Sequence, residues 1–437
     1  MMQELKQAVC AAIDAKQEEI IAIGEDILRH PELGYREVRT SALVKEQFER
    51  LGLTGLSFPA LTGVKGWLRG RGGVTVAVMG ELDAVLSPLH PFADPLTGAA
   101  HACGHNGQIA AMLGCAMGLS AVRESLGGDV CFLAAPAEEY CELAYRSELR
   151  QQGKIRYFGG KQQMIAEGAF EDIDMAMMVH SETNAAGAHV VTGGDSTGFI
   201  GKTVRFIGRE AHAGGAPWEG INALNAAALA IQAIHCQRET FRDTDHVRVH
   251  PILTKGGDLV NTVPADVRME SYVRAGNLPA MQAANAKVNR AIRGAAYAIG
   301  AEVDLEDIPG YLPLNQNRIL GQFFSQNASL LLPEVAVEDG LPFCGSTDAG
   351  DLSCLIPLIQ PTVSGFTGAA HSKDFRISDP RLAYLVPAKL MAMTVVDLLA
   401  EDGAAAKDIR SAFCRKTPKQ YDELWAQLMK SDGSSPE

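Results

Sequence analysis

Apolar residues form short continuous runs along the chain, and these alternate with longer stretches of helical pattern. Four runs are bounded by glycine, proline or charged residues, at 74–80, 129–136, 175–180 and 361–366. Runs of this length are typical of strands buried on both faces, as in a parallel sheet between helices. Apolar residues at three- and four-residue spacing predict helices at 35–51, 107–123, 160–169 and 380–400. We therefore predict an α/β fold with a mostly parallel sheet.

The pattern changes between residues 197 and 309, where apolar and polar residues alternate as in strands with one exposed face. The order is strand, helix, strand, strand, helix, strand, with the first five elements at 198–209, 221–239, 247–257, 267–276 and 279–299. This order is the split βαβ pattern of an α+β domain. The parallel-sheet pattern resumes afterwards. We predict a first domain in two parts, 1–196 and 310–437, interrupted by a second domain at 197–309.

The charge of the chain limits the partners that we expect, and its cysteines indicate its cellular location. The chain has 39 basic and 52 acidic residues, a formal net charge of −13, and it carries no basic run. Nucleic acids and anionic membrane surfaces are therefore not expected as partners. We expect no apolar stretch to approach the length needed to cross a bilayer, and the N-terminal 20 residues do not resemble a secretory signal. Nine cysteines, mostly within apolar segments, indicate reduced thiols in a cytoplasmic protein.

Acidic residues and histidines follow the predicted buried strands directly. They are Glu81 and Asp83 after the first strand, Glu138 and Glu139 after the second, His180 at the end of the third and His371 beyond the fourth. His101, Cys103 and His105 stand in the sequence HACGHN, immediately before the helix at 107–123. Because open α/β sheets bind ligands at the carboxyl ends of their strands, we expect these side chains to converge.

Each of these residues also has a structural alternative. A histidine that ends a strand is often only hydrogen-bonded, and Cys103 alone resembles a small buried apolar residue. Glu138 and Glu139 fit a solvated turn, and Asp83 fits a helix cap. All of these alternatives would have to hold at one sheet edge, so we favour a shared site. Cysteine, histidine and carboxylate donors suit zinc, manganese or cobalt, and the glutamate pair allows one carboxylate to bind metal while its neighbour moves a proton.

Seven motifs appear in order along the chain, within a likeness that runs from about residue 20 to 400. They are GELDA, HACGHN, PAEE, a histidine after an apolar strand, GREAHAGGAP, NTVPAD and GSTDAGD. Together they resemble metallopeptidase family twenty, and most closely its amidohydrolase branch of aminobenzoyl-glutamate hydrolases, indole-acetyl-amino-acid hydrolases and aminoacylase-like dipeptidases. The resemblance implies a zinc-peptidase-like catalytic domain at 1–196 and 310–437, interrupted by a ferredoxin-like lid at 197–309 that forms a homodimer. It also implies hydrolysis of the amide bond of small N-acyl amino acids or dipeptide-like substrates with a free carboxylate.

The resemblance further implies two divalent metal ions per subunit, Mn²⁺ or Zn²⁺ and alternatively Co²⁺. The implied ligands are Cys103 as the bridge, His105 and His180 on one ion, and Glu139 and His371 on the other. Glu138 would be the general base and then the general acid. Asp83 would orient a neighbouring ligand. His101 matches no ligand position, so we expect a supporting role for it.

The predicted lid carries a second set of candidates. By the resemblance, His212 would polarise the scissile carbonyl oxygen in the active site of the partner subunit. Asn261 and Arg274 would hold the carboxylate of the substrate, for which a guanidinium is well shaped. The structural alternatives are a turn residue before Pro217 for His212 and an exposed strand residue for Arg274.

The sequence departs from the family pattern at two places, one at a ligand position and one after the PAEE motif. Many relatives have His-x-Asp where this chain has Glu81-Leu82-Asp83, so Glu81 is a candidate for an additional metal ligand. Residues 140–158 stand between PAEE and a GGK segment that follows almost directly in relatives. This insertion fits either a surface helix or a specificity element.

Two other functions are compatible with parts of the sequence. One is a small-molecule-binding relative of the same fold that has lost catalysis. The other is a thiol hydrolase with Cys103 as nucleophile and His101 or His105 as base. The glutamate pair argues against the first, and His180 and His371 favour metal over the second.

Overall fold

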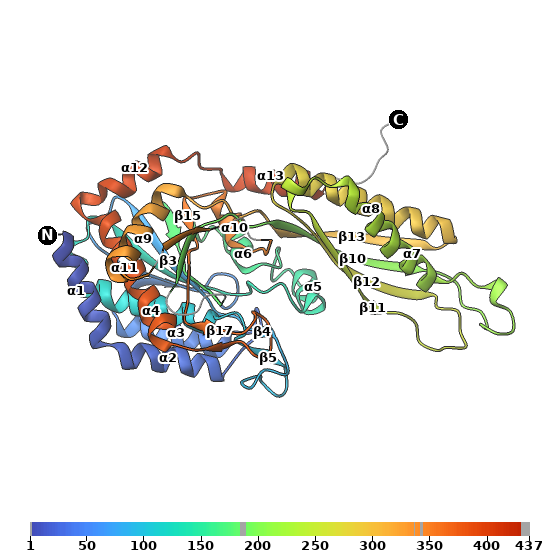
Figure 1. The fold of residues 1–437 in the computed structure, drawn as a ribbon, viewed down its shortest axis with the longest axis horizontal. Coiled ribbons are helices and arrows are strands. Elements are labelled where there is room, and N and C mark those ends of the chain that lie inside the picture. Colours follow the sequence, from blue (N-terminus) through green and yellow to red (C-terminus); the bar gives the residue numbers. More distant parts are fainter. Residues whose placement is uncertain (1, 184–188, 336, 341–343, 430–437) are drawn as a thin grey trace. The chain divides into compact units, whose positions relative to one another are not determined.

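The computed structural model describes residues 2–183, 189–335, 337–340 and 344–429 (Figure 1). The chain divides into two compact units. The first unit comprises Met1–Gly194, Asn315–Leu341 and Asp351–Pro418, and the second comprises Asp195–Leu314, Pro342–Gly350 and Lys419–Glu437. The pattern of the sequence did not indicate that the two short later segments group with the second unit.

The main sheet of the first unit has six strands in the order β1-β2-β6-β3-β7-β15. Their bounds are β1 Thr54–Ser57, β2 Val64–Leu68, β3 Thr75–Glu81, β6 Asp129–Ala135, β7 Met175–Met177 and β15 Leu358–Ile359. Strand β3 runs parallel to β6 and β7, and β15 runs parallel to β7. The prediction of an α/β fold with a parallel sheet is confirmed, and β1 and β2 extend it as antiparallel strands.

Helix α4, His105–Ser120, lies at the centre of the first unit, and its residues from His105 to Leu119 are all buried. It packs against β3 and against three other helices, α1 (Met2–Ala15), α2 (Gln17–Arg29) and α11 (Val386–Leu399) (Figure 1). A helix covered on every side needs apolar or small residues all around its axis, as the sequence of α4 provides. The remaining helices of eight or more residues that lie in this unit are α3 Val38–Arg50, α5 Leu143–Gln151, α9 Arg318–Leu331 and α12 Ala404–Ala412.

The apolar run at 361–366 does not form a strand of the main sheet, so this prediction is wrong. Thr362 and Val363 form β16 in a smaller sheet of order β14-β9-β16-β8 (Val337–Gly340, Val190–Gly193, Thr362–Val363 and His180–Ser181). The chain then turns at Gly365, which has a φ of +124°, and a Cβ there would lie 2.5 Å from the backbone nitrogen of Ala383. Only glycine fits this turn, and it divides the run before β17, Phe366–Thr367.

The apolar segment near the C-terminus is longer than we expected. Residues Arg381–Leu399 form a helical segment long and apolar enough to cross a membrane, although we predicted that no stretch approaches that length. The apolar window of this segment is 94% buried within the protein. It packs against α4, α1 and α9, as a core helix does.

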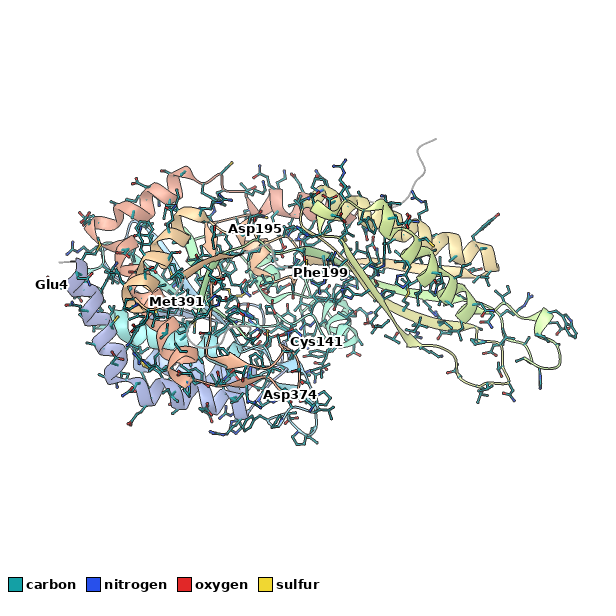
Figure 2. All side chains as sticks on the ribbon, viewed as in Figure 1. Glu4, Cys141, Asp195, Phe199, Asp374 and Met391 are labelled. Carbon is teal, nitrogen blue, oxygen red and sulfur yellow. The ribbon has the colours of Figure 1, made fainter. Side chains whose placement is uncertain are left out.

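The second unit contains a four-stranded antiparallel sheet of order β11-β12-β10-β13. The elements follow the chain as β10 Gly198–Ile207, α7 Ala223–Cys236, β11 Arg248–Lys255, β12 Asp266–Ala275, α8 Leu278–Ile299 and β13 Glu302–Tyr311. Helices α7 and α8 pack against each other and against β10 and β12. Asp195 and Phe199, at the start of this unit, are labelled in Figure 2. The unit has the split βαβ order that the sequence predicts.

Candidate active site

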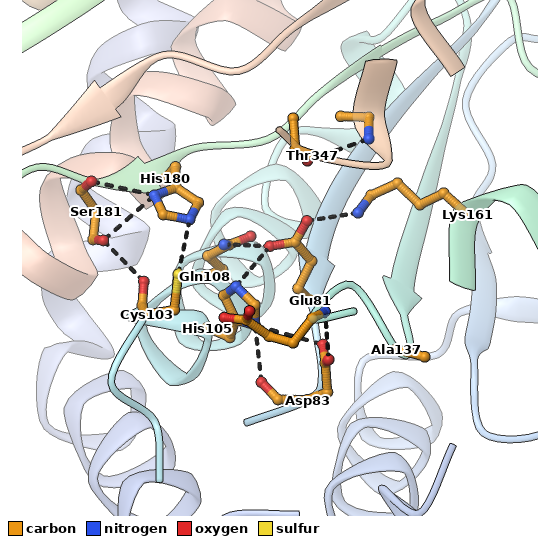
Figure 3. Close-up of polar contacts among 12 residues, drawn as sticks. Glu81, Asp83, Cys103, His105, Gln108, Ala137, Lys161, His180, Ser181 and Thr347 are labelled. Carbon is orange, nitrogen blue, oxygen red and sulfur yellow. Dashed lines mark hydrogen bonds and ion pairs between the residues drawn. The ribbon is translucent and has the colours of Figure 1, made fainter. Parts of the chain in front are cut away.

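The loop before α4 places sulfur and imidazole donors close together at the first turn of the helix. Gly104 separates Cys103 from His105 and has a φ of +88°, and a Cβ there would lie 2.9 Å from the Cβ of Ser181. The turn therefore requires glycine. It brings the Cys103 Sγ to 3.5 Å from the Nε2 of His180, the first residue of β8 (Figure 3).

Two groups of donor atoms share the Cys103 sulfur. Cys103 with His105 and His180 forms one group, and Cys103 with Glu139 and His371 forms the other. Within each group the donor atoms lie within 4.8 Å of one another. The structure thus brings together all five side chains that the sequence proposed as metal ligands.

The polar surroundings of these donors fit a metal. The Nδ1 of His105 lies 2.8 Å from the carbonyl oxygen of Asp83, so a proton on Nδ1 leaves the lone pair of Nε2 for a metal. The facing atoms of the cluster are paired with one another, since the Nε2 of His105 lies 3.0 Å from Glu81 Oε2 and the Nε2 of His371 lies 3.2 Å from Glu139 Oε1. A metal ion held by these imidazoles would displace the protons that the pairs share.

The charges around Cys103 favour its thiolate form. Burial alone would raise the pKa of the thiol, but His180 and His105 outweigh it and hold this pKa well below its usual range. Hydrogen bonds to Cys103 and Glu139 raise the pKa of His371 to about 11. The thiolate is the form of cysteine that binds metal.

The glutamate pair follows β6 on a backbone turn with unusual geometry. Ala137 has a φ of +52°, a left-handed conformation that non-glycine residues rarely adopt. Its N–H donates to Glu37 Oε1 at 2.8 Å, and the N–H of Glu139 donates to Asp83 Oδ2 at 2.9 Å. Glu138 and Glu139 are both buried. Backbone strain of this kind is found most often at functional sites.

Glu81 forms a third potential donor group with His105 and Glu138. Its carboxylate, however, is already paired. Lys161 Nζ lies 2.6 Å from Oε1, and Gln108 Nε2 donates to Oε2 at 2.7 Å (Figure 3). Glu81 and Lys161 are both fully buried. Burial would raise the pKa of Glu81, but Lys161 and His105 outweigh it and lower this pKa. A fixed cation beside Glu81 argues against a metal ion at the same carboxylate.

His101 is buried but does not belong to any of the three donor groups. Burial, followed by the charge of His105, lowers the pKa of His101 to about 3. The ring is therefore neutral at physiological pH. This placement agrees with a supporting role better than with a ligand.

The three lid candidates all lie in the second unit. The N–H of Ala213, next to His212, donates to the carbonyl oxygen of Asn261 at 2.9 Å, so these two candidates lie on neighbouring segments. The N–H groups of Gly214 and Gly215 donate to Nδ1 of His212, which leaves the proton on Nε2. Arg274, on β12, donates to Ser346 Oγ at 2.6 Å and to His250 Nε2 at 3.3 Å.

Three buried acidic or basic residues near the site were not predicted from the sequence. They are Glu37 beside the glutamate turn, Lys161 beside Glu81, and Arg146 in the insertion. One signal for Arg146 was available, because it lies midway between Leu143 and Leu149 at three-residue spacing, on the apolar face of a short helix. The insertion contains a surface helix with one buried face, which carries Arg146, and one exposed face, and a role in specificity stays a prediction.

An α/β domain that gathers cysteine, histidine and carboxylate donors beside a glutamate pair defines a metallohydrolase type of site. The model of peptidase family M20/M25/M40 matches residues 77–389, and the chain belongs to this family. It is accordingly a hydrolase of amide bonds.

Individual relatives agree with this assignment. The chain is 30% identical over 446 residues to the Xaa-Arg dipeptidase of Mus musculus, covering 96% of this chain and 94% of that protein. It is 26% identical over 322 residues to the N-acyl-L-amino acid amidohydrolase of Geobacillus stearothermophilus, covering 71% and 81%. A solved dinuclear metal-binding peptidase of the M20 family from Bacillus subtilis has the same fold, with a TM-score of 0.66, 23% identity and coverage of 88% and 99%.

Proposed function

We propose that the chain is a dinuclear metal amidohydrolase that cleaves the amide bond of a dipeptide or a small N-acyl amino acid with a free carboxylate. The observation that carries this proposal is the pair of donor groups that share the Cys103 sulfur, with Glu138 next to the ligand candidate Glu139. A non-catalytic binding protein does not need a spare base at this position. Membership of a peptidase family does not favour the binding protein or the thiol hydrolase.

The residues present fit two divalent ions. Cys103 would bridge them, with His105 and His180 on one ion and Glu139 and His371 on the other. When bound, Mn²⁺, Zn²⁺ or Co²⁺ supplies Lewis-acid activation of the water and of the scissile carbonyl. Asp83 contacts both the imidazole of His105 and the backbone of Glu139, so it would hold two ligands in orientation.

Glu138 would perform the proton transfers. Its carboxylate takes a proton from the attacking water as the oxygen bonds to the amide carbon. It then delivers this proton to the nitrogen as the C–N bond breaks. The products are a carboxylic acid and an amine, and Glu138 returns to its ionised form.

The second unit would act as a lid that binds substrate and forms a homodimer. Nε2 of His212 carries the proton required to donate to a carbonyl oxygen in the partner subunit. Asn261 and Arg274 would hold the carboxylate of the substrate. The edge strand β11 exposes Ile252 and Leu253, as expected of a strand that pairs with a second copy.

The relatives suggest which substrates to test first. Those from Mus musculus and Homo sapiens are Xaa-Arg dipeptidases, so dipeptides with C-terminal arginine come first.

We also propose a cytoplasmic location. All nine cysteines lie in the described residues as free thiols, which supports this location.

The experiment that tests the proposal begins with removal of metal by a chelator. The metal-free protein is reloaded separately with Mn²⁺, Zn²⁺ and Co²⁺ and assayed on Xaa-Arg dipeptides, other dipeptides and N-acyl amino acids. We expect chelation to abolish hydrolysis and at least one ion to restore it at about two per chain. Full activity of protein shown by elemental analysis to be metal-free would overturn the proposal.

A further inference from the structure

Arg146 lies in the insertion at residues 140–158, which follows the glutamate pair. Cys141, near the start of this insertion, is labelled in Figure 2. It is on helix α5, and the side chain is fully buried. Its guanidinium lies over the rings of Tyr35 at 5.5 Å and Tyr140 at 5.9 Å. Burying a guanidinium is costly unless its surroundings compensate for the lost water, so such an arginine needs an explanation.

The guanidinium donates to three backbone carbonyl groups. Nη1 donates to the oxygens of Phe158 at 2.6 Å and Ala137 at 3.3 Å. Nη2 donates to the oxygen of Glu139. The carbonyls of Ala137 and Glu139 belong to the two residues that flank Glu138. One rigid, planar group therefore holds the turn on both sides of the proposed base.

The N–H groups of the same two residues are held by other buried side chains. Glu37 accepts from Ala137, and Asp83 accepts from Glu139. All four backbone polar groups that flank Glu138 are thus held. The two N–H groups donate to Glu37 and Asp83, and the two carbonyls accept from Arg146 and also from the N–H groups of Gly160 and Cys141. Ala137 is also held in a left-handed conformation, which persists only where the surroundings enforce it.

Space around the guanidinium is tight. A Cβ on Gly34 would lie 2.5 Å from Nη2 of Arg146 and 2.9 Å from the Cα of Ala137. The arginine therefore has little freedom to move away from the turn. A lysine in its place would keep the charge, but a single ammonium group on a flexible stem lacks the planar fork that reaches carbonyls on both sides of Glu138.

We propose that Arg146 is a positioning residue for catalysis. It acts through the carbonyl groups of Ala137 and Glu139, and it fixes the direction of the Glu138 and Glu139 side chains. Helix α5 is then a support of the active site and not an accessory surface element. This inference rests on the proposed function of Glu138 and Glu139.

The test compares Arg146→Lys with Arg150→Lys in the full chain loaded with the ion that restores activity. Arg150 lies one helical turn further along α5, with its guanidinium over the Phe158 ring at 4.8 Å, and so controls for the loss of an arginine from the insertion. Hydrogen exchange at the amides of Ala137 and Glu139, measured on metal-free protein, reports the turn independently of hydrolysis. Kinetics then report whether the turn matters to the reaction.

We expect Arg146→Lys to speed exchange of these amides by at least ~10-fold, while amides of α4 and β3 are unchanged. We expect kcat to fall by roughly 10–100-fold with KM within about threefold, because misplacement of a catalytic group by about 1 Å has effects of this size. Arg150→Lys should change neither. A folded Arg146→Lys protein with unchanged exchange or unchanged kcat overturns the inference.

Two further outcomes keep the test decisive. If Arg146→Lys does not fold, the amides of Ala137 and Glu139 in the unmodified protein must still be among its slowest to exchange. Exchange there as fast as on the exposed face of α5 overturns the inference. If the unmodified, metal-loaded protein hydrolyses no substrate, both the proposed function and this inference are overturned. If the unmodified protein is active and the Arg146→Lys variant is equally active, only this inference is overturned.

Discussion

At the scale of single residues, Glu138 is the side chain on which the proposed chemistry depends most directly. It is buried beside Glu139 on a turn with fixed backbone geometry. The substitution Glu138→Gln keeps the shape of the side chain and removes its basicity. General acid–base catalysis contributes about 10²–10⁴-fold, so we expect kcat to fall by at least ~10²-fold with metal content unchanged.

Elemental analysis and steady-state kinetics of the same preparation measure both quantities. Glu148→Gln, the same substitution on the exposed face of α5, is the matched control and should retain full activity. A Glu138→Gln protein that keeps a tenth of the activity would show that a different group accepts the proton.

At the scale of elements, strand β12 carries two arginines whose surroundings differ. Arg274 donates to Ser346, whereas Arg268 is exposed and pairs with Asp266. If Arg274 binds the carboxylate of the substrate, Arg274→Ala should raise KM for substrates with a free carboxylate by ~10-fold or more, since a charged hydrogen bond contributes about 1.5–3 kcal/mol. Amidated analogues should be affected much less.

The measurement is KM for each substrate and its amide with the Arg274→Ala and Arg268→Ala proteins. Arg268→Ala should leave both values near those of the unmodified protein. Equal increases for the acid and the amide with Arg274→Ala would assign Arg274 to the shape of the strand alone.

The elements differ in how well the sequence predicts them. The β3 and β6 strands were predicted because complete burial leaves an unbroken apolar pattern. Helix α4 was predicted from its three- and four-residue apolar spacing, although it is buried all around its axis. The run at 361–366 was assigned wrongly, because its pattern does not record that the chain reverses at Gly365. Periodicity reports burial, but it does not report which sheet a strand joins.

In the candidate site, too, the sequence predicts some residues and misses others. Residues with metal-donor side chains at strand ends were predicted, because their chemistry and position are visible in the sequence. Glu37 and Lys161 were not, because a buried acidic or basic side chain resembles a solvated one until its distant partners are known. Lys161 and Glu81, for example, are separated by 80 residues and meet only in the folded protein. Arg146 was missed although its spacing from Leu143 and Leu149 places it on the apolar face of a helix.

At the scale of the whole molecule, His212 tests the proposed exchange of catalytic residues between subunits. A hydrogen-bond donor to the developing oxyanion contributes roughly 10²–10³-fold to the rate, so both Glu138→Gln and His212→Ala should be nearly inactive alone. If His212 acts in the partner subunit, a mixed dimer of these two chains has one site with both residues intact. Random mixing gives about one half mixed dimers, so activity should return to about a quarter of normal.

The measurement is hydrolysis after the two inactive variants are refolded together, with mixed dimers quantified by mass spectrometry. Each variant refolded with itself is the control. Mixed dimers that form without activity would place His212 in its own subunit's site or outside the mechanism.

The ion pair between Glu81 and Lys161 also constrains how this protein can have evolved. Removal of one partner leaves an uncompensated buried charge at a cost of about 3–5 kcal/mol, which is a large share of the 5–15 kcal/mol by which proteins are typically stable. A lineage that loses Lys161 while it keeps Glu81 must therefore pass through a severely weakened ancestor. We expect an alignment of relatives to show lysine at position 161 wherever position 81 is glutamate.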